Sequence, residues 1–477
     1  IAWGFTVFGI DQQDLYVEKL DPSDPNRYAT ETGWESMRVE TEEIRILGGQ
    51  KLDVAVKWTR HGPVVWDDGR RALALRWVGA EPGTAPYLGS LALDRAESWQ
   101  DFLAAMERWK VPSENIVYAD ARGNIGELSA GLAPIRKGWT GLLPVAGTGS
   151  FEWNGFLPTS RLPRAWNPSS GFIATANHKM VPEAYPYAIG FEWAPPYRFD
   201  RIVEVLRGGG GPAKKLTFED MERLQGDVVS LLARDLVRLL GSAAPAPTDP
   251  AARLLASWNG SLDRDSAAAA LYETWVPELR REVARRIAPK EAWDLVESSL
   301  PSRVWLRALR DPQPEAFGPS PREERDRLLR DTVEAAAAKL RELSGNDPAG
   351  WSWGKLHSIR FRHPLHRAAG AESILDLPPV ARPGDGTTVN ATAAGSGFEQ
   401  RAGASFREIL DPLDWDRSVA VNAPGQSGQP ASPHYADLLS LWSETRYFPL
   451  LYTKAAVERE TVDRLVLEPD ARAGVRR

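Results

Sequence analysis

The chain has 477 residues, a formal net charge of −6 and no cysteine. The negative balance, with no basic stripe interleaved with aromatic residues, argues against nucleic-acid binding, and no apolar run reaches the roughly 18 residues of a membrane-spanning helix. The lack of cysteine excludes disulfides, thiolate catalysis and zinc-finger sites. The length allows about three ordinary domains or one continuous core with insertions.

Residues 1–206 are expected to be mostly β-structure, because short β-type runs alternate with clusters of Gly, Pro and Asp. One helix is predicted around residues 99–109. The clearest predicted strands lie at residues 6–8, 15–17, 53–56, 64–65 and 72–77.

The run RGGGGP at residues 207–212 ends this part, and a helical insertion is predicted over residues 207–345. Its first helix follows TFED at residues 217–220, which is similar to a capping box, and apolar residues keep helical spacing from Met221 to Leu239. Residues 346–477 are expected to return to the core with strands at 404–410 and 418–421 and a helix from near His434. Strands, then helices, then strands again predict an α+β fold.

A polar residue follows a β-type run in GFIATANH at residues 171–178. Phe172 and Ile173 are predicted to be extended and to deliver Asn177 to a cleft, and Arg198 in GFEWAPPYR supplies a guanidinium. An amide N–H can stabilise a developing oxyanion, and an Arg can orient it. An Asn at a strand end is also a common turn or cap residue, so chemistry alone leaves both interpretations open.

These two segments resemble the large chain of the penicillin acylase family, amidases of the N-terminal-nucleophile hydrolase superfamily. The resemblance implies an αββα layered sheet sandwich with a helical insertion. It covers nearly the whole chain, continuing in order through TRHGP (59–63), YADARGNIG (118–126), LPVAGTG (143–149), WSWGKLH (351–357), GTTVN (386–390) and NAPGQSGQPASPHY (422–435).

In that family the large chain begins with a Ser exposed by self-cleavage of a precursor, well before the strand at which this chain starts. The sequence therefore indicates a fragment of a self-processed zymogen whose nucleophile lies elsewhere. The α-amine of such a Ser has a pKa of about 8 in peptides and can act as the base for its own hydroxyl. By residue match, the oxyanion donors are the backbone N–H of Val7 and the side chain of Asn177, with Arg198 in the orienting role.

Phe5 and Phe8 are candidates for the acyl pocket. Because side chains alternate along a strand, at most one of them is expected on a given face, and core packing is the alternative for each. The resemblance favours Phe5.

The DQQD run at residues 11–14 can form a solvated turn or hold a hard cation. The resemblance implies a structural calcium at Asp11, the Gln13 carbonyl and Asp14, although a further family carboxylate before Gly190 has no counterpart here. No organic cofactor is expected. The H-x5-H-x2-H pattern of His357, His363 and His366 lacks an HExxH frame and is a weak metal motif.

We therefore expect an amidohydrolase that cleaves N-acyl amides, such as penicillins, through an acyl-enzyme. Its expected partners are a small-molecule acyl amide substrate and a small chain from the same precursor, and its expected location is periplasmic or extracellular. The alternatives are an N-acyl homoserine lactone acylase, a catalytically silent scaffold fragment and a His-based metallohydrolase.

Overall fold

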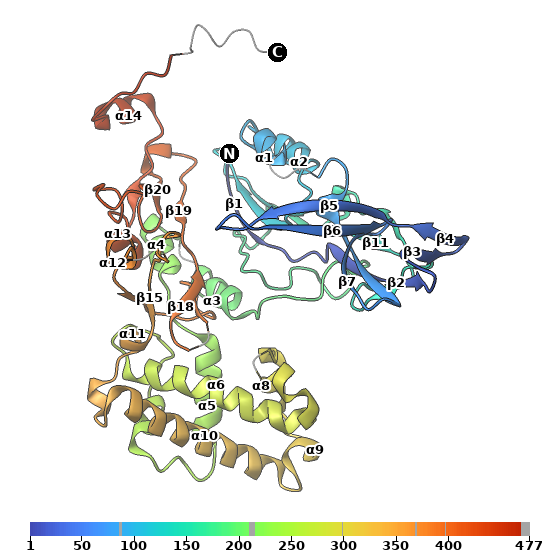
Figure 1. Ribbon diagram of the computed structural model, residues 1–477. Helices are drawn as coiled ribbons and strands as arrows, with labels where there is room; N and C mark the ends of the chain where they lie inside the picture. Colours follow the sequence, from blue (N-terminus) through green and yellow to red (C-terminus); the bar gives the residue numbers. More distant parts are fainter. Residues whose placement is uncertain (85–87, 209–214, 298, 368–369, 396, 469–477) are drawn as a thin grey trace. The chain divides into compact units, whose positions relative to one another are not determined.

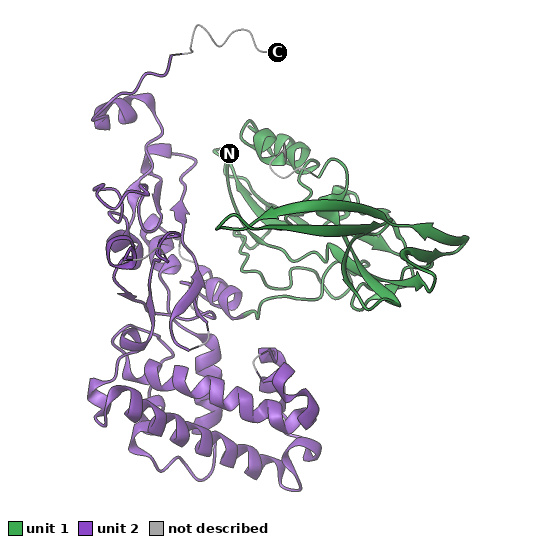
Figure 2. Ribbon diagram, viewed as in Figure 1, with its two compact units in different colours: residues 1–196 green, residues 197–477 purple. Residues whose placement is uncertain are grey.

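The computed structural model describes residues 1–84, 88–208, 215–297, 299–367, 370–395 and 397–468 (Figure 1). The chain divides into two compact units, Ile1–Pro196 and Tyr197–Arg477 (Figure 2). The expected first part therefore ends at Pro196 rather than at residue 206, since α3 (Tyr197–Leu206) already belongs to the second unit. The expected ranges 207–345 and 346–477 share that unit, and residues 209–214 of the glycine-rich break lie outside the described residues.

A four-stranded antiparallel sheet in the first unit carries the predicted oxyanion strand. Its apolar face packs on α1 (Leu88–Leu93) and on α2 (Trp99–Met106), which the Ser98 side chain caps. The Tyr118 ring lies 5.3 Å from Trp99 and 5.4 Å from Phe102 in this core. The strand order is β1 (Ala2–Val7), β9 (Glu114–Ala119), β10 (Ile125–Ala130) and β14 (Arg164–Trp166), so β1 is an edge strand.

The second sheet of this unit contains the remaining predicted strands. The runs predicted at residues 15–17, 53–56, 64–65 and 72–77 are confirmed as parts of β2, β6, β7 and β8. The order is β4 (Gly33–Ser36), β3 (Asp24–Thr30), β2 (Gln13–Asp21), β8 (Arg71–Trp77), β7 (Gly62–Asp67), β6 (Lys51–Thr59) and β5 (Arg38–Arg45), with β12 (Val145–Ala146) parallel to β2. A separate pair joins β11 (Pro134–Arg136) to β13 (Trp153–Phe156).

Local packing explains the TRHGP run. Gly62 has φ of +133°, and a Cβ there would lie 2.1 Å from the Leu75 carbonyl oxygen, so only glycine fits this turn. The neighbouring His61 is buried, with Nδ1 2.7 Å from Glu18 Oε1 and Nε2 3.0 Å from Glu152 Oε1. The motif is therefore a structural junction between β6 and β7.

The second unit begins with a helical part around two long antiparallel helices, α6 (Ala267–Ile287) and α10 (Pro321–Ser344), which lie side by side in Figure 1. Trp275 is fully buried between them and donates to Thr332 Oγ1 at 2.9 Å. The core also includes residues of α5 (Leu231–Gly241), α8 (Ser302–Arg310), α9 (Pro314–Phe317) and α11 (Trp353–Leu356). The short α7 (Trp293–Val296) contacts α6.

The capping box is confirmed at the start of α4 (Phe218–Gln225), where Thr217 and Asp220 exchange both bonds. The prediction of one continuous helical stripe from Met221 to Leu239 is wrong. Gly226 ends α4, and the Ser230 side chain caps a new helix, α5. The helical spacing of apolar residues does not reveal the break between the two helices, because each helix buries an apolar stripe with the same spacing.

Small sheets and helices close the second unit. The strands form the pairs β15 (Ser358–Ile359) with β16 (Val380–Ala381) and β17 (Thr392–Ala394) with β18 (Gln400–Gly403), and the triplet β19 (Arg407–Ile409), β20 (Val419–Val421) and β21 (Phe448–Pro449). The helices are α12 (Glu372–Leu375), α13 (Leu439–Ser443) and α14 (Lys454–Glu460). The predicted helix from His434 is wrong, because the Tyr435 N–H donates to Ser432 O and closes a turn around His434, and α13 begins only at Leu439. In the described part of the chain, no helix combines the length and apolar character needed to cross a membrane.

Candidate active site

Val7 presents its backbone at the open edge of the four-stranded sheet. The next residue, Phe8, donates its N–H to Ser113 O at 3.1 Å and so forms a hydrogen-bonded pair of the ladder. Such pairs alternate with non-hydrogen-bonded pairs in an antiparallel sheet. Val7, opposite Glu114, therefore turns its N–H and C=O away from β9. Its side chain is exposed (57%), which leaves this edge accessible within the first unit.

Asn177 lies directly against this edge. Its Nδ2 donates to Val7 O at 3.0 Å, which brings together the two predicted oxyanion residues. The backbone of Asn177 is left-handed, with φ of +61°, a region that Asn tolerates better than most residues. The expectation of a strand at Phe172 and Ile173 is wrong: the segment is irregular, and no described strand pairs with it.

The Gly190 segment holds Asn177 from the other side. Ala194 donates its N–H to Asn177 O at 2.9 Å, and Asp11 donates to Ile189 O at 2.8 Å. A Cβ on Gly190 would lie 2.4 Å from Gly9 O, so the two backbones meet only because this residue is glycine. The part of the second predicted motif that lies in the first unit, residues 190–196, thus contacts the first motif.

Arg198, the predicted orienting residue, lies in α3 of the second unit. Burial lowers the pKa of its guanidinium. Its orienting role stays a prediction.

The two candidate pocket residues lie in different environments. Phe8 is 1% exposed and packs on Trp193 in the core, with ring centroids 5.3 Å apart. Phe5 is 61% exposed, and its ring centroid lies 6.4 Å from that of Trp109. We therefore consider only Phe5 further as an acyl-contacting residue. Trp109 was not predicted, because a Trp just after a helix carries no signal of its own.

The acidic residues Asp11 and Asp14 are held by a buried arginine, and Asp14 lies at the start of β2 rather than in a turn. Arg136 Nε lies 2.8 Å from Asp14 Oδ2, and its Nη2 lies 3.3 Å from Asp11 Oδ2 and 3.1 Å from Asp11 O. Trp153 Nε1 donates to the same Asp14 oxygen at 2.6 Å. Burial raises the pKa of both Asp11 and Asp14, and the nearby Arg136 opposes that rise. Sequence reasoning missed Arg136, which lies far along the chain in no recognisable motif.

Asp11, Gln13 and Asp14 also provide some of the oxygen ligands that a cation site requires. Asp14 Oδ1 is buried without a hydrogen-bond partner, and Asp11, Gln13 and Asp14 line one pocket of about 800 Å³ together with Val7 and Glu192. Arg136 pairs with both carboxylates, and Arg76 also lowers the pKa of Asp14. The described residues contain no group of three His, Cys, Asp or Glu side chains arranged for a metal. The residues fit a calcium ion only if further oxygen ligands come from water or from other parts of the protein.

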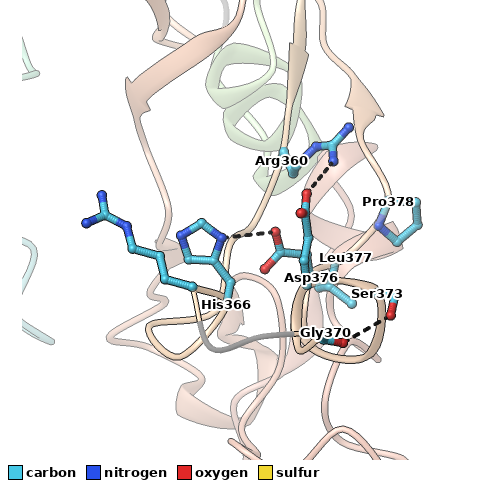
Figure 3. Close-up of a pocket in the computed structure, with 9 residues that line it drawn as sticks. Arg360, His366, Gly370, Ser373, Asp376, Leu377 and Pro378 are labelled. Atoms are coloured by element: carbon cyan, nitrogen blue, oxygen red, sulfur yellow. Dashed lines mark hydrogen bonds and ion pairs between the residues drawn. The ribbon is translucent and has the colours of Figure 1, made fainter.

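The three histidines of the H-x5-H-x2-H pattern do not converge. His357 is fully buried, stacks on Trp353 and lies 2.7 Å from Phe398 O through Nδ1. Figure 3 shows His366 facing Asp376 instead, with Nδ1 3.7 Å from Oδ2, in a separate pocket that Arg360 also lines. His363 Nδ1 accepts from the Leu365 N–H. This arrangement gives no support to a His-based metallohydrolase.

Comparison with known proteins identifies the fold and the family of this chain. A solved structure, the thermostable penicillin G acylase from Alcaligenes faecalis, aligns with a TM-score of 0.74 over 98% of this chain and 88% of that one, at 23% identity. The fold is thus the α+β fold of the N-terminal-nucleophile hydrolases. Residues 1–459 match the model of the family described as penicillin amidase, and the chain belongs to that family.

Three relatives show how much of the protein this chain represents. The penicillin acylase 2 proenzyme of Pseudomonas sp. (strain SE83) is 31% identical over 98% of this chain and 61% of its own length. The acyl-homoserine lactone acylase QuiP of Pseudomonas aeruginosa is 28% identical over 96% and 60%, and the penicillin G acylase of Escherichia coli is 27% identical over 98% and 58%. The chain therefore spans about three fifths of the length of these relatives.

Proposed function

We propose that the protein containing this chain is an amidohydrolase that cleaves N-acyl amides, and that this chain supplies its oxyanion site. The observation that carries the proposal is the contact of Asn177 Nδ2 with Val7 O at the open edge of β1. This contact puts a side-chain donor beside a backbone N–H that faces away from the ladder. Two such donors at one exposed point suit the developing charge of a tetrahedral intermediate.

The nucleophile in this proposal is an N-terminal Ser that is absent from this sequence. Its α-amine takes the hydroxyl proton, and the hydroxyl oxygen attacks the acyl carbonyl carbon. The carbonyl oxygen becomes an oxyanion that accepts from Val7 N–H and Asn177 Nδ2. The C–N bond then breaks, the amine leaves with the proton, and water hydrolyses the acyl-enzyme by the same steps.

Two features support an apolar acyl group. Phe5 and Val7 expose large apolar side chains on the strand that carries the backbone donor. The relatives named as penicillin acylases and as acyl-homoserine lactone acylases are similar to this chain along nearly its whole length. An acyl-homoserine lactone is accordingly the second candidate substrate, on the strength of the similarity to QuiP.

We also propose a structural calcium at Asp11, the Gln13 carbonyl and Asp14. The unpartnered Asp14 Oδ1, which lies with Asp11 and Gln13 along one pocket, supports it. Here the ion stabilises the connection between β1 and β2 and takes no part in proton transfer. A small chain from the same precursor is proposed as the partner, since one relative is named as a proenzyme. A periplasmic or extracellular location stays a prediction.

Hydrolysis by the full-length, processed protein tests this function. Phenylacetyl and medium-chain acyl amides with a chromogenic amine, and N-acyl homoserine lactones of matched chain length, separate the two substrate classes. Turnover of either class with a trapped acyl-Ser supports the amidohydrolase. A processed protein that turns over neither substrate class and forms no acyl-enzyme is a silent scaffold.

A further inference from the structure

A line of buried polar side chains crosses the four-stranded sheet and ends beside the two oxyanion residues. Ser129 Oγ lies 3.1 Å from Glu127 Oε1 and 2.9 Å from Asn115 Oδ1. Asn115 Nδ2 lies 3.4 Å from Thr6 Oγ1, which in turn donates to Thr175 Oγ1 at 3.0 Å. We call this series the Glu127–Thr175 line. Asn115 and Ser129 are fully buried and Glu127 is 3% exposed, so these groups depend on one another for hydrogen bonds.

Strand register creates the line. Thr6 pairs with Asn115, and Asn115 pairs with Ser129, so three adjacent strands place a polar side chain at the same level on one face. Glu127 is two residues from Ser129 and shares that face. The opposite face carries the apolar core under α1 and α2. A polar row within an otherwise apolar sheet lowers stability unless it is fully hydrogen-bonded.

The number of hydrogens available for hydrogen bonds indicates which group is the first donor of the Glu127–Thr175 line. The Ser129 hydroxyl has one hydrogen but two oxygen neighbours, Glu127 Oε1 and Asn115 Oδ1. In the orientation of the Asn115 carboxamide, Nδ2 faces Thr6, so Oδ1 needs the Ser129 hydrogen. A neutral Glu127 completes the series by donating to Ser129 Oγ. An ionised Glu127 would instead take the Ser129 hydrogen and leave Asn115 Oδ1 without a donor.

The surroundings of Glu127 favour the neutral acid. Its register neighbours on β9 and β14 are Val117 and Ala165, and Gly4 on β1 lies opposite Val117. Within the described residues, no charged side chain influences the carboxyl group, and burial raises its pKa to about 7. The Ser129 hydrogen bond opposes this rise only in part.

We propose that the Glu127–Thr175 line is a positioning device for the oxyanion site, an inference that rests on the proposed function. Thr6 directly precedes Val7, and Thr175 lies two residues before Asn177. The Thr6–Thr175 bond and the Asn177–Val7 bond therefore join the irregular Asn177 segment to β1 at two points. With both hydrogen bonds present, the Val7 N–H and the Asn177 carboxamide keep a fixed separation. With only one of them, the Asn177 segment could rotate about that bond. Thr6, Thr175 and Glu127 are positioning residues and do not touch the substrate.

The test uses the full-length, processed protein. Thr6→Val keeps the side-chain shape and removes the hydroxyl, so kcat is expected to fall about tenfold with little change in KM, the size of one lost hydrogen bond. Thr175→Val is expected to have the same effect, and Thr6→Ser should restore turnover. Thr41→Val, an exposed threonine on β5, is the matched control and should leave kcat unchanged. Glu127→Gln, which donates at every pH, should remove any fall in kcat that wild type shows as pH rises through 7.

Two readouts do not depend on activity. Crystal structures of Thr6→Val should show the Asn177 Nδ2 to Val7 O distance lengthened beyond hydrogen-bond range, while Thr6→Ser keeps it. Carboxyl 13C NMR should give Glu127 a titration midpoint near 7 that Ser129→Ala displaces. If the wild-type protein hydrolyses no acyl amide, the proposed function fails, and these two readouts decide the positioning role alone. Wild-type kcat and an unchanged Asn177–Val7 distance in Thr6→Val would overturn the inference.

Discussion

Arg136 Nε lies 2.8 Å from Asp14 Oδ2, and both side chains are almost completely buried, at 3% and 1% exposure. The pair joins β11 to the start of β2, the strand that follows the oxyanion strand β1 in the sequence. A buried ion pair of this kind contributes little net stability against an apolar replacement of both partners. Removing one partner alone is costly, because the other charge stays buried.

Arg136→Met is therefore expected to lower the free energy of unfolding by about 3 to 5 kcal/mol. Arg45→Met is the matched control, because Arg45 is 82% exposed in its pair with Glu43 and such pairs contribute at most about 1 kcal/mol. Denaturant unfolding of the full-length protein measures both. Equal losses in the two variants would show that the buried pair has no special role.

Asn177→Ala is expected to lower kcat about 100- to 1,000-fold, with a much smaller change in KM, because the lost donor acts mainly in the transition state. Alanine is strained at φ of +61°, so Asn177→Gly, which accepts that backbone, separates strain from chemistry. Both variants should lose turnover alike. His363→Ala is the control, and its kcat should stay near that of wild type. Self-cleavage is checked first by N-terminal sequencing. The proposed mechanism is contradicted if Asn177→Ala has the wild-type kcat while His363→Ala has a much lower one.

Chelation tests the proposed calcium. If Asp11 and Asp14 hold the ion, excess chelator should lower the thermal midpoint of the full-length protein by mass action, and added calcium should restore it. The pH profile of hydrolysis should not change. Asp14→Asn should abolish the response to chelator, and metal analysis should show the loss of bound calcium. The proposal is wrong if chelator leaves the thermal midpoint of wild type unchanged and the purified protein contains no calcium. Arg136 alone would then hold Asp11 and Asp14.

The stability of the first unit should depend on the pH through Glu127. Burial raises the folded-state pKa of this carboxyl from 4.5 to about 7. A raised pKa favours the protonated folded state, so this contribution is fully present below pH 4.5 and is lost as the pH rises through 7. Its full size is on the order of 3 kcal/mol. Glu127→Gln should reduce this slope in denaturant titrations and leave the part due to Glu114, whose pKa burial also raises to about 7, while Glu42→Gln, on exposed β5, should leave the slope unchanged.

Gly190→Ala is expected to lower stability by about 1 to 3 kcal/mol through overpacking and to reduce kcat as well. The added Cβ would lie 2.4 Å from Gly9 O, so the segment that binds Asn177 has to move. Gly428→Ala adds the same atom where nothing lies within 4 Å and is the control. Unfolding and steady-state kinetics of both variants measure the effect. An unchanged kcat in Gly190→Ala would show that the close approach does not position Asn177.

Local sequence signals predicted local structure well. Short β-type runs between turn residues located β1, β2, β6, β7 and β8 but not β3, β4 or β5, and the TFED run located the capping box, because these signals depend on neighbouring residues. The Asn177–Val7 contact joins residues 170 positions apart, and no periodicity encodes such a distance. Only the family resemblance linked these residues. Arg136 stayed unpredicted for the same reason, since its partners lie more than a hundred residues earlier.

The Asn177 side chain also limits how far the sheet can grow. An edge strand offers its N–H and C=O groups to any further strand. On β1, a strand added at the open side could bond at Trp3 and Phe5, but at Val7 it would meet the carboxamide that already occupies the carbonyl oxygen. The ladder must stop there. The Val7 N–H is therefore not used in strand pairing. It stays available to donate a hydrogen bond to a reacting carbonyl group.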